Sequence, residues 1–195
     1  MAYNSLRDFM QHLETEGALT RVRTPVSPEL EVTEIQTRLL AESGPAVLFE
    51  NVVDSENKPY GMPMLVNLFG SVSRVAMGMG QTPETLHEIG DMLAFLRQPE
   101  PPGGWREAFE MLPLLRRVMT MKPKSVSAGA CQEVVWTGDD VDLHRLPIQT
   151  CWPGEPGPLI TWPLVVTRGP GTAREDDYNL GIYRMQVTGR NTTCM

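Results

Sequence analysis

The sequence predicts an α+β protein: an α/β domain over residues 1–124, followed by a strand-rich domain over residues 125–195. Three observations support this division. Helical apolar spacing alternates with short apolar strands up to about residue 119, which is typical of an α/β layer. The composition shifts near residues 122–127. Beyond that point helical patterns disappear, and short strand-like runs are separated by glycine, proline and aspartate turns.

The first domain is predicted to begin with an amphipathic helix. Ser5 and Asp8 form a candidate capping pair at its start, and Gly17 is a candidate stop. The apolar residues between them follow the i, i+3, i+4, i+7 spacing of one helix face: Leu6, Phe9, Met10 and Leu13. A strand, a second helix and two more strands are then expected at residues 18–22, 32–42, 46–49 and 64–69.

The rest of the first domain is predicted to be helical. A short helix is expected over residues 71–77, and Thr82 followed by Pro83 is a strong start for a longer one. The buried face of that longer helix is expected to comprise Leu86, Ile89, Leu93 and Leu96. A further helix is expected over residues 105–119.

The second domain is predicted to contain strands at residues 133–136, 160–167 and 179–188. An acidic run, Asp139–Asp142, lies between the first two. It lacks the glycine and the distal glutamate of an EF-hand loop, so we interpret it as a solvated turn and not as a calcium site.

Charge and cysteine content exclude several classes of protein. The net charge of −7, without a basic stripe, argues against binding to nucleic acid. Three scattered cysteines form neither a disulfide framework nor a zinc motif, and they suit a reducing cytoplasm. The N-terminus does not resemble a signal peptide, and no apolar run approaches the length of a membrane span.

The stretch Asp177–Arg184 contains the most informative polar residues. Asn179 carries an amide oxygen that can coordinate a hard cation, and Arg184 carries donors suited to carboxylate or phosphate. Strict alternation would place them on opposite strand faces, but a glycine within a strand often marks a bulge. We therefore predict a bulge or bend at Gly181 that turns both groups toward one site. The alternative is two surface residues on an edge strand.

The segment Asn179-Leu-Gly-Ile182-Tyr-Arg184 resembles the Asn-x-x-Ile-x-Arg motif of the UbiD family, the decarboxylases that use prenylated flavin mononucleotide (FMN). Other segments, in order along the whole chain, resemble the 3-polyprenyl-4-hydroxybenzoate decarboxylase branch of that family. They are residues 6–9, 44–50, 67–70, 76–80, 138–143 and 150–153.

This resemblance implies that residues 125–195 begin a split β-barrel that binds prenylated FMN. Asn179 would coordinate a divalent metal, expected to be manganese, next to the flavin phosphate. Ile182, Tyr183 and Arg184 would line the cofactor. Arg184 would also belong to a Glu–Arg–Glu network beside the reacting carbon, which makes it the candidate catalytic residue.

The resemblance also implies the reaction, which is non-oxidative loss of carbon dioxide from an aromatic or α,β-unsaturated acid. For this branch the expected substrate is a 3-polyprenyl-4-hydroxybenzoate, a ubiquinone precursor. Its apolar tail would bring a cytoplasmic enzyme into peripheral contact with the inner membrane. The full-length enzyme is expected to be a homo-oligomer.

Family members are more than twice as long as this chain, and their Arg-Trp-Leu and His-Arg-Gly segments would follow Met195. We therefore expect an N-terminal fragment that neither decarboxylates nor holds flavin tightly by itself. The alternatives are a UbiD-type decarboxylase of another acid, a flavin-binding split-barrel module without lyase activity, and an inactive truncation product that pairs with intact subunits.

Overall fold

A computed structural model describes residues 3–98, 104–105, 112, 116, 126–170 and 178–195. The chain divides into two compact units. One comprises Met1–Gln81 together with Thr137–Met195, and the other comprises Thr82–Trp136. The predicted domain boundary after residue 124 stays a prediction.

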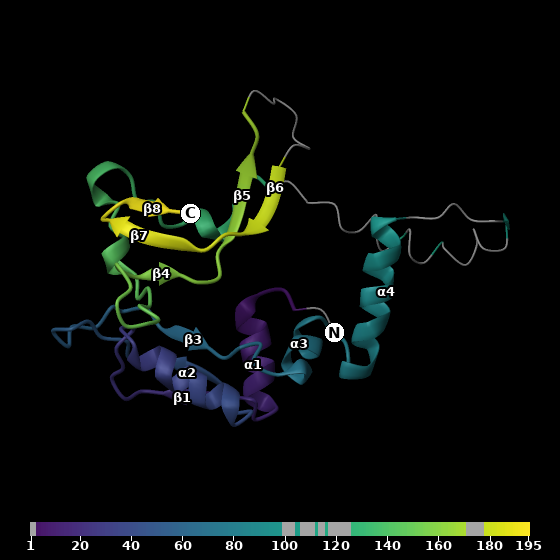
Figure 1. Cartoon of the computed structure of the whole chain (residues 1–195), viewed down its shortest axis with the longest axis horizontal. Helices are drawn as coiled ribbons and strands as arrows, with labels where there is room; N and C mark the ends of the chain where they lie inside the picture. Colours follow the sequence, from purple (N-terminus) through teal and green to yellow (C-terminus); the bar gives the residue numbers. More distant parts are fainter. Residues whose placement is uncertain (1–2, 99–103, 106–111, 113–115, 117–125, 171–177) are drawn as a thin grey trace. The chain divides into compact units, whose positions relative to one another are not determined.

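The first unit contains a three-stranded sheet flanked by helices (Figure 1). Strand β1 pairs parallel with β2, and β2 pairs antiparallel with β3, in the order β1-β2-β3. The elements in chain order are α1 (Leu6–Thr15), β1 (Leu19–Val22), α2 (Glu31–Ala41), β2 (Ala46–Phe49) and β3 (Met64–Val66). The predicted order of helices and strands is confirmed here, although β3 ends earlier than expected.

The capping signals at α1 behave as predicted. The Ser5 hydroxyl accepts a hydrogen bond from the Asp8 backbone N–H at 3.2 Å. Gly17, just after the helix, has a φ of 68°, which glycine adopts without steric cost. Helix α2 begins after Leu30, whose φ of 63° is unusual for a leucine.

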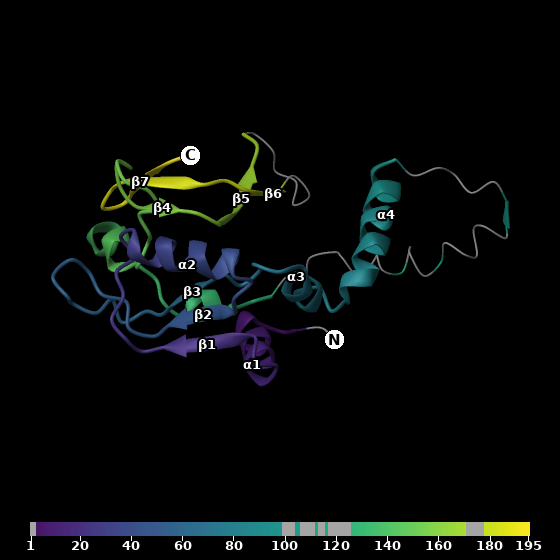
Figure 2. The same ribbon diagram turned by 60° about the horizontal axis from the view of Figure 1, so that its bottom comes forward.

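The central strand β2 is buried on both faces, because one helix covers each side of the sheet. Val47 and Phe49 pack in one cluster with Val32 of α2, while Ala46 and Leu48 pack in a second cluster with α1. Figure 2 shows α2 running along its face of the sheet. Alternating side chains of one strand therefore hold both helices in place.

Two more helices follow β3. Helix α3 (Val72–Gly78) belongs to the first unit, and its N-cap Ser71 accepts a hydrogen bond from the Arg74 N–H at 3.3 Å. In the second unit, a 3₁₀ turn at Pro83–Thr85 leads into α4 (Leu86–Arg97), so Pro83 does start the helical segment.

The buried face that we predicted for α4 is not observed. None of its residues is buried in the part of the chain that the structure describes, and Leu93 is 55% exposed. Helical spacing predicts which residues share a face, but it cannot supply the surface that covers that face. The helix predicted over residues 105–119 lies mostly outside the described residues.

The C-terminal part of the first unit is made of short strands. A sheet in the order β4-β7-β8 contains Leu159–Ile160, Met185–Gly189 and Thr192–Cys194. A separate hairpin contains β5 (Leu164–Arg168) and β6 (Tyr178–Ile182) (Figure 1). The described residues form no closed barrel, so the split barrel stays a prediction.

Three strand predictions need correction. Residues 133–136 form no strand, and both valines there are at least 70% exposed. The strand expected at 160–167 is broken around Pro163, which lacks the N–H that a ladder requires. The strand expected at 179–188 is two strands, with the break at Tyr183 and Arg184. No helix within the described residues is long and apolar enough to cross a membrane.

Candidate ligand-binding site

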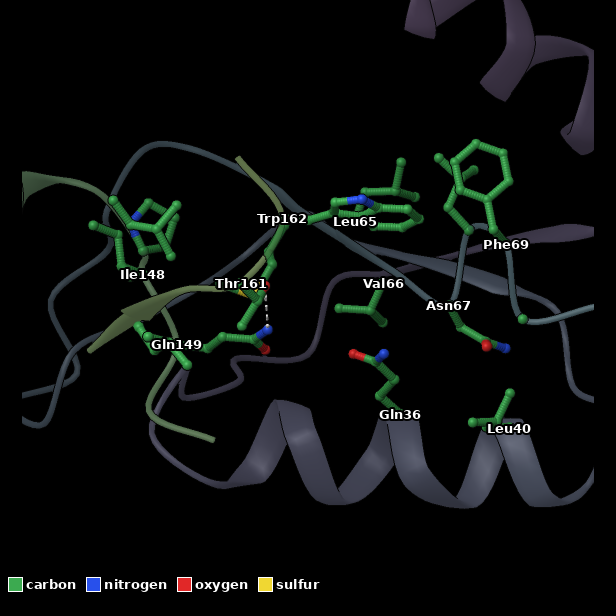
Figure 3. Close-up of a pocket in the computed structure, with 16 residues that line it drawn as sticks. Gln36, Leu40, Leu65, Val66, Asn67, Phe69, Ile148, Gln149, Thr161 and Trp162 are labelled. Carbon is green, nitrogen blue, oxygen red and sulfur yellow. Dashed lines mark hydrogen bonds between the residues drawn. The ribbon is translucent and has the colours of Figure 1, made fainter. Parts of the chain in front are cut away.

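A groove lies between helix α2 and the chain from Pro147 to Trp162, inside the first unit (Figure 3). It consists of two adjoining pockets, of about 500 Å³ and about 490 Å³. The pockets are continuous because they share lining residues from both walls: Gln36, Leu40, Gln149, Thr161 and Trp162. We call this feature the α2 groove. Its size is within the range of small-molecule sites.

Helix α2 supplies one wall through a stripe at i, i+3, i+4 and i+7: Thr33, Gln36, Thr37 and Leu40. The neighbouring face of the helix packs into the core through the fully buried Val32. Because the core fixes the helix, the stripe is held toward the groove. In Figure 3, Gln36 and Leu40 rise from the helix toward the pocket.

The opposite wall comes from residues far along the chain. The Gln149 amide nitrogen donates to the Thr161 hydroxyl at 3.4 Å (Figure 3). Trp162, which lines both pockets, meets Phe69 edge to face, with ring centroids 5.5 Å apart. Backbone hydrogen bonds join the two walls: the Leu30 N–H donates to the Thr150 carbonyl at 2.9 Å, and the Thr150 N–H donates to the Pro28 carbonyl at 3.1 Å.

At one end the groove is lined by Cys151, Trp152, Ile182 and Arg184. Arg184 is the one charged residue among the described residues that line either pocket. A single cation with otherwise neutral, partly aromatic walls favours a ligand that has one anionic group on an apolar body.

Cys151 is buried beside this cation, and its surroundings disfavour the thiolate form. Burial raises the pKa of its thiol, and this outweighs the opposing effects of the Thr33 hydroxyl and the Arg184 charge. The Glu155 carboxylate accepts hydrogen bonds from the backbone N–H groups of Cys151 at 2.6 Å and Trp152 at 3.1 Å. These bonds fix the shape of the chain at this end of the groove.

The predicted bulge at Gly181 is wrong. The register of β5 and β6 is regular throughout, with Gly181 opposite Val165. The glycine has a different role: a Cβ at this position would lie 2.5 Å from the Tyr183 ring, so its absence lets the ring fold across the strand.

The structure therefore separates the predicted site residues. Ile182 and Arg184 line the α2 groove, whereas Asn179 and Tyr183 do not. In a regular strand Asn179 and Ile182 point to opposite faces. The Asn179 amide nitrogen donates to the Tyr183 hydroxyl at 3.3 Å and to the Thr167 hydroxyl at 3.4 Å.

The described residues do not by themselves build a metal site. They contain no cluster of three or more histidine, cysteine, aspartate or glutamate side chains, and Asn179 offers one neutral oxygen. A hard divalent cation takes about six oxygen ligands. The donor set present here is therefore too small to hold such an ion.

Sequence reasoning missed most of the groove. The stripe on α2 has a readable signal, since Thr33, Gln36, Thr37 and Leu40 share one helical face beside the apolar one. Gln149 has no such signal, because the sequence around it has no periodicity. Only the tertiary fold places it opposite α2.

Two family models match this chain. The 3-octaprenyl-4-hydroxybenzoate carboxy-lyase N-terminal domain matches residues 10–93, and the Rift-related domain of the same carboxy-lyase matches residues 123–195. Together they cover most of the sequence, one after the other.

Solved structures give the same result. A UbiD-class enzyme, HmfF, from Pelotomaculum thermopropionicum in complex with prenylated FMN is 27% identical, with a TM-score of 0.69 over 96% of this chain and 37% of that chain. The vanillic acid decarboxylase of Sedimentibacter hydroxybenzoicus in closed form is 27% identical, with a TM-score of 0.70 over 97% of this chain and 36% of that chain.

A 3,4-dihydroxybenzoic acid decarboxylase from Enterobacter cloacae is 23% identical, with a TM-score of 0.70 over all of this chain and 37% of that one, and it supports the fold alone. The chain spans a little over a third of the length of these structures. Its two domain models in sequence and its structural likeness to UbiD-class enzymes agree with the motif at Asn179–Arg184: the chain belongs to the UbiD family of decarboxylases.

Proposed function

We propose that the protein is a non-oxidative carboxy-lyase that acts with prenylated FMN on an aromatic or α,β-unsaturated acid. One observation carries the proposal: Arg184 is the lone charged residue lining a groove with neutral and aromatic walls, among the described residues. An arginine binds a carboxylate or phosphate strongly because its planar guanidinium group can donate two parallel hydrogen bonds to it, and no other charged residue among the described groove residues competes for that anion.

Ile182 and Arg184 are the residues that would contact the flavin from this chain, and Tyr183 would support them from the other face of β6. The fit is favourable, since the Ile182 side chain offers the ring system an apolar contact. HmfF was solved both with prenylated FMN and with FMN. The chemistry such a flavin supplies is acceptance of electron density as carbon dioxide leaves.

Arg184 has two tasks in this proposal. Its permanent charge would hold the substrate carboxylate in place before the carbon–carbon bond breaks, and it would bias the protonation of the carboxylates in the Glu–Arg–Glu network. Trp152 and Trp162 offer their rings to the apolar body of the substrate.

The substrate we propose is a 3-polyprenyl-4-hydroxybenzoate of ubiquinone biosynthesis. The names of both matching family models support it, since they refer to a 3-octaprenyl-4-hydroxybenzoate carboxy-lyase. The alternative is a smaller aromatic acid, as in the vanillic acid decarboxylase. A polyprenyl tail would bring the protein into peripheral contact with the inner membrane.

We further propose that Asn179 supplies one ligand to a manganese ion, with the other ligands coming from outside the described residues. Homo-oligomer formation belongs to the same proposal. One solved relative is described as an evolved dimeric form.

An arginine substitution tests the proposed function. Replacing Arg184 by alanine in a flavin-loaded, full-length enzyme that contains this chain should lower kcat/KM for decarboxylation by about 100-fold or more, because an electrostatic contact to the reacting group is lost. Carbon dioxide release measures this directly. Arg168→Ala is the matched control, since it removes the same charge from an exposed position on β5 outside the groove. Full turnover in Arg184→Ala would refute the role of Arg184.

A further inference from the structure

Two buried side-chain atoms lack a hydrogen-bond partner within the described residues: the Thr33 hydroxyl oxygen and the Gln149 amide oxygen. They come from opposite walls, and both residues line the α2 groove at its Arg184 end. Leaving a buried polar atom unpaired costs about 1–3 kcal/mol. Two such atoms beside one pocket are therefore best explained by a group that pairs with them.

Neighbouring residues do not satisfy these atoms. The Cys151 thiol lies beside the Thr33 hydroxyl, but sulfur is a weak partner. The nearby Thr37 hydroxyl is already used, since it donates to the Thr33 carbonyl at 2.8 Å. Turning the Gln149 amide would exchange oxygen for nitrogen and still leave one polar atom unpaired, because only the Thr161 hydroxyl bonds to it.

The unpaired groups define the chemistry of the missing partner. A threonine hydroxyl donates and accepts, and an amide offers either function depending on its orientation. A ligand hydroxyl is one small group that can donate to one of them and accept from the other. Both residues line the groove, so a change of side-chain rotamer at Thr33 and at Gln149 would turn these buried atoms toward such a ligand.

We propose that Thr33 and Gln149 are specificity-determining residues that bind a hydroxyl group of the ligand whose carboxylate lies at Arg184. This inference rests on the proposed function, because it uses the same groove and the same anionic anchor. It adds a selection step: acids that carry a hydroxyl group are bound in preference to acids that lack one.

The test compares benzoate with 3-hydroxybenzoate and 4-hydroxybenzoate in NMR titrations of the protein, with and without flavin. NMR suits weak binding, and it reads affinity without turnover. The native protein should bind one of the hydroxylated acids about 3- to 10-fold more tightly than benzoate, as expected for one or two net hydrogen bonds.

Thr33→Val and Gln149→Leu should each bring this ratio close to one while the Kd for benzoate stays nearly constant. The Tm of Thr33→Val should stay level or rise, because the change removes a buried polar atom that has no partner. Gln149→Leu also removes the hydrogen bond to Thr161, so its Tm is not a criterion. Thr37→Val is the matched control. It makes the same change at a groove position whose hydroxyl is already bonded, so it should leave the ratio unchanged.

An unchanged ratio in both Thr33→Val and Gln149→Leu would overturn the proposal. So would a lower Tm in Thr33→Val together with an unchanged ratio, which would mean that the hydroxyl serves the fold. Arg184→Ala separates this inference from the proposed function. If it leaves every Kd unchanged, the role of Arg184 fails, while the ratio still decides the role of Thr33 and Gln149.

Discussion

At the scale of single residues, the best-defined cluster surrounds Arg74, which is 6% exposed and has no carboxylate partner among the described residues. It donates to the Asn67 carbonyl at 3.0 Å. Asn67 is itself buried with a φ of 55°, and its amide donates to the carbonyls of Gly44 and Pro45 at 3.0 and 2.9 Å. These bonds shape the loop that forms one end of the α2 groove.

Gly70 leaves the space that this cluster needs. A Cβ there would lie 1.8 Å from the Asn67 amide oxygen, which hydrogen bonds hold in place. We expect Gly70→Ala to lower the free energy of unfolding by about 1–3 kcal/mol, as overpacking usually does. Urea unfolding followed by circular dichroism measures it.

The control for this change is Gly169→Ala, in the same unit, where a Cβ meets nothing within 4 Å. It should change stability by less than about 0.5 kcal/mol. Equal effects of the two substitutions would show that the Asn67 cluster rearranges to accommodate the extra methyl group without loss of stability.

At the scale of elements, the edge strand β1 carries an ion-pair network. Arg21 pairs with Glu14 and, at 2.9 Å, with Glu50, and Arg23 pairs with Glu50 at 3.0 Å. Hydrogen bonds from Arg21 and Arg23 hold the pKa of Glu50 below its ordinary value of 4.5. Charged side chains along an edge strand also discourage pairing with another chain.

This network predicts a pH dependence. Because the folded pKa of Glu50 is lowered, its contribution to stability is present above pH 4.5 and is lost as the pH falls through the folded pKa. Glu50→Gln should therefore have a lower Tm than the native protein at pH 7. This Tm difference, the gap, should shrink as the pH is lowered. Thermal unfolding between pH 7 and pH 3 measures the gap.

Glu56→Gln serves as the control, since this exposed carboxylate forms no ion pair that the structure records. A gap that stays constant with pH would mean that Glu50 acts through packing and not through its charge. High salt should narrow the gap at pH 7, because exposed ion pairs are screened.

At the scale of the whole molecule, one face of the β5–β6 hairpin is apolar and exposed. Five of the side chains that alternate onto it are each between 57% and 68% exposed: Leu164, Val166, Tyr178, Leu180 and Ile182; the sixth, Arg168, lies at one end of the face, opposite Tyr178. A contiguous apolar face of this kind promotes association with other surfaces.

The hairpin therefore predicts self-association of this chain. Replacing the cross-strand neighbours Val166 and Leu180 by lysine and glutamate should shift light scattering toward the monomer without lowering Tm, since the new charges attract each other. Leu6→Glu is the control, because Leu6 is an exposed leucine on α1, outside this face. Unchanged scattering in the double variant would exclude the hairpin as the contact.

Local sequence signals were sufficient for the N-terminal layer. The cap at Ser5, the stop at Gly17 and the four-residue strand Ala46–Phe49 were all predictable, because each depends on neighbours within a few residues. The motif at Asn179–Arg184 likewise indicated the family, since it can be read directly from the types and spacing of its residues. Ile182 and Arg184 could be expected at a site on that basis.

The tertiary structure alone decided how these parts form a groove. Backbone hydrogen bonds at Thr150 bring Gln149 opposite Thr33, more than one hundred residues away, and no local pattern encodes that pairing. The regular register of β6 turned Asn179 away from the groove, against the predicted bulge. Helical and strand periodicity specify which side chains share a face, whereas what covers that face depends on contacts between distant segments.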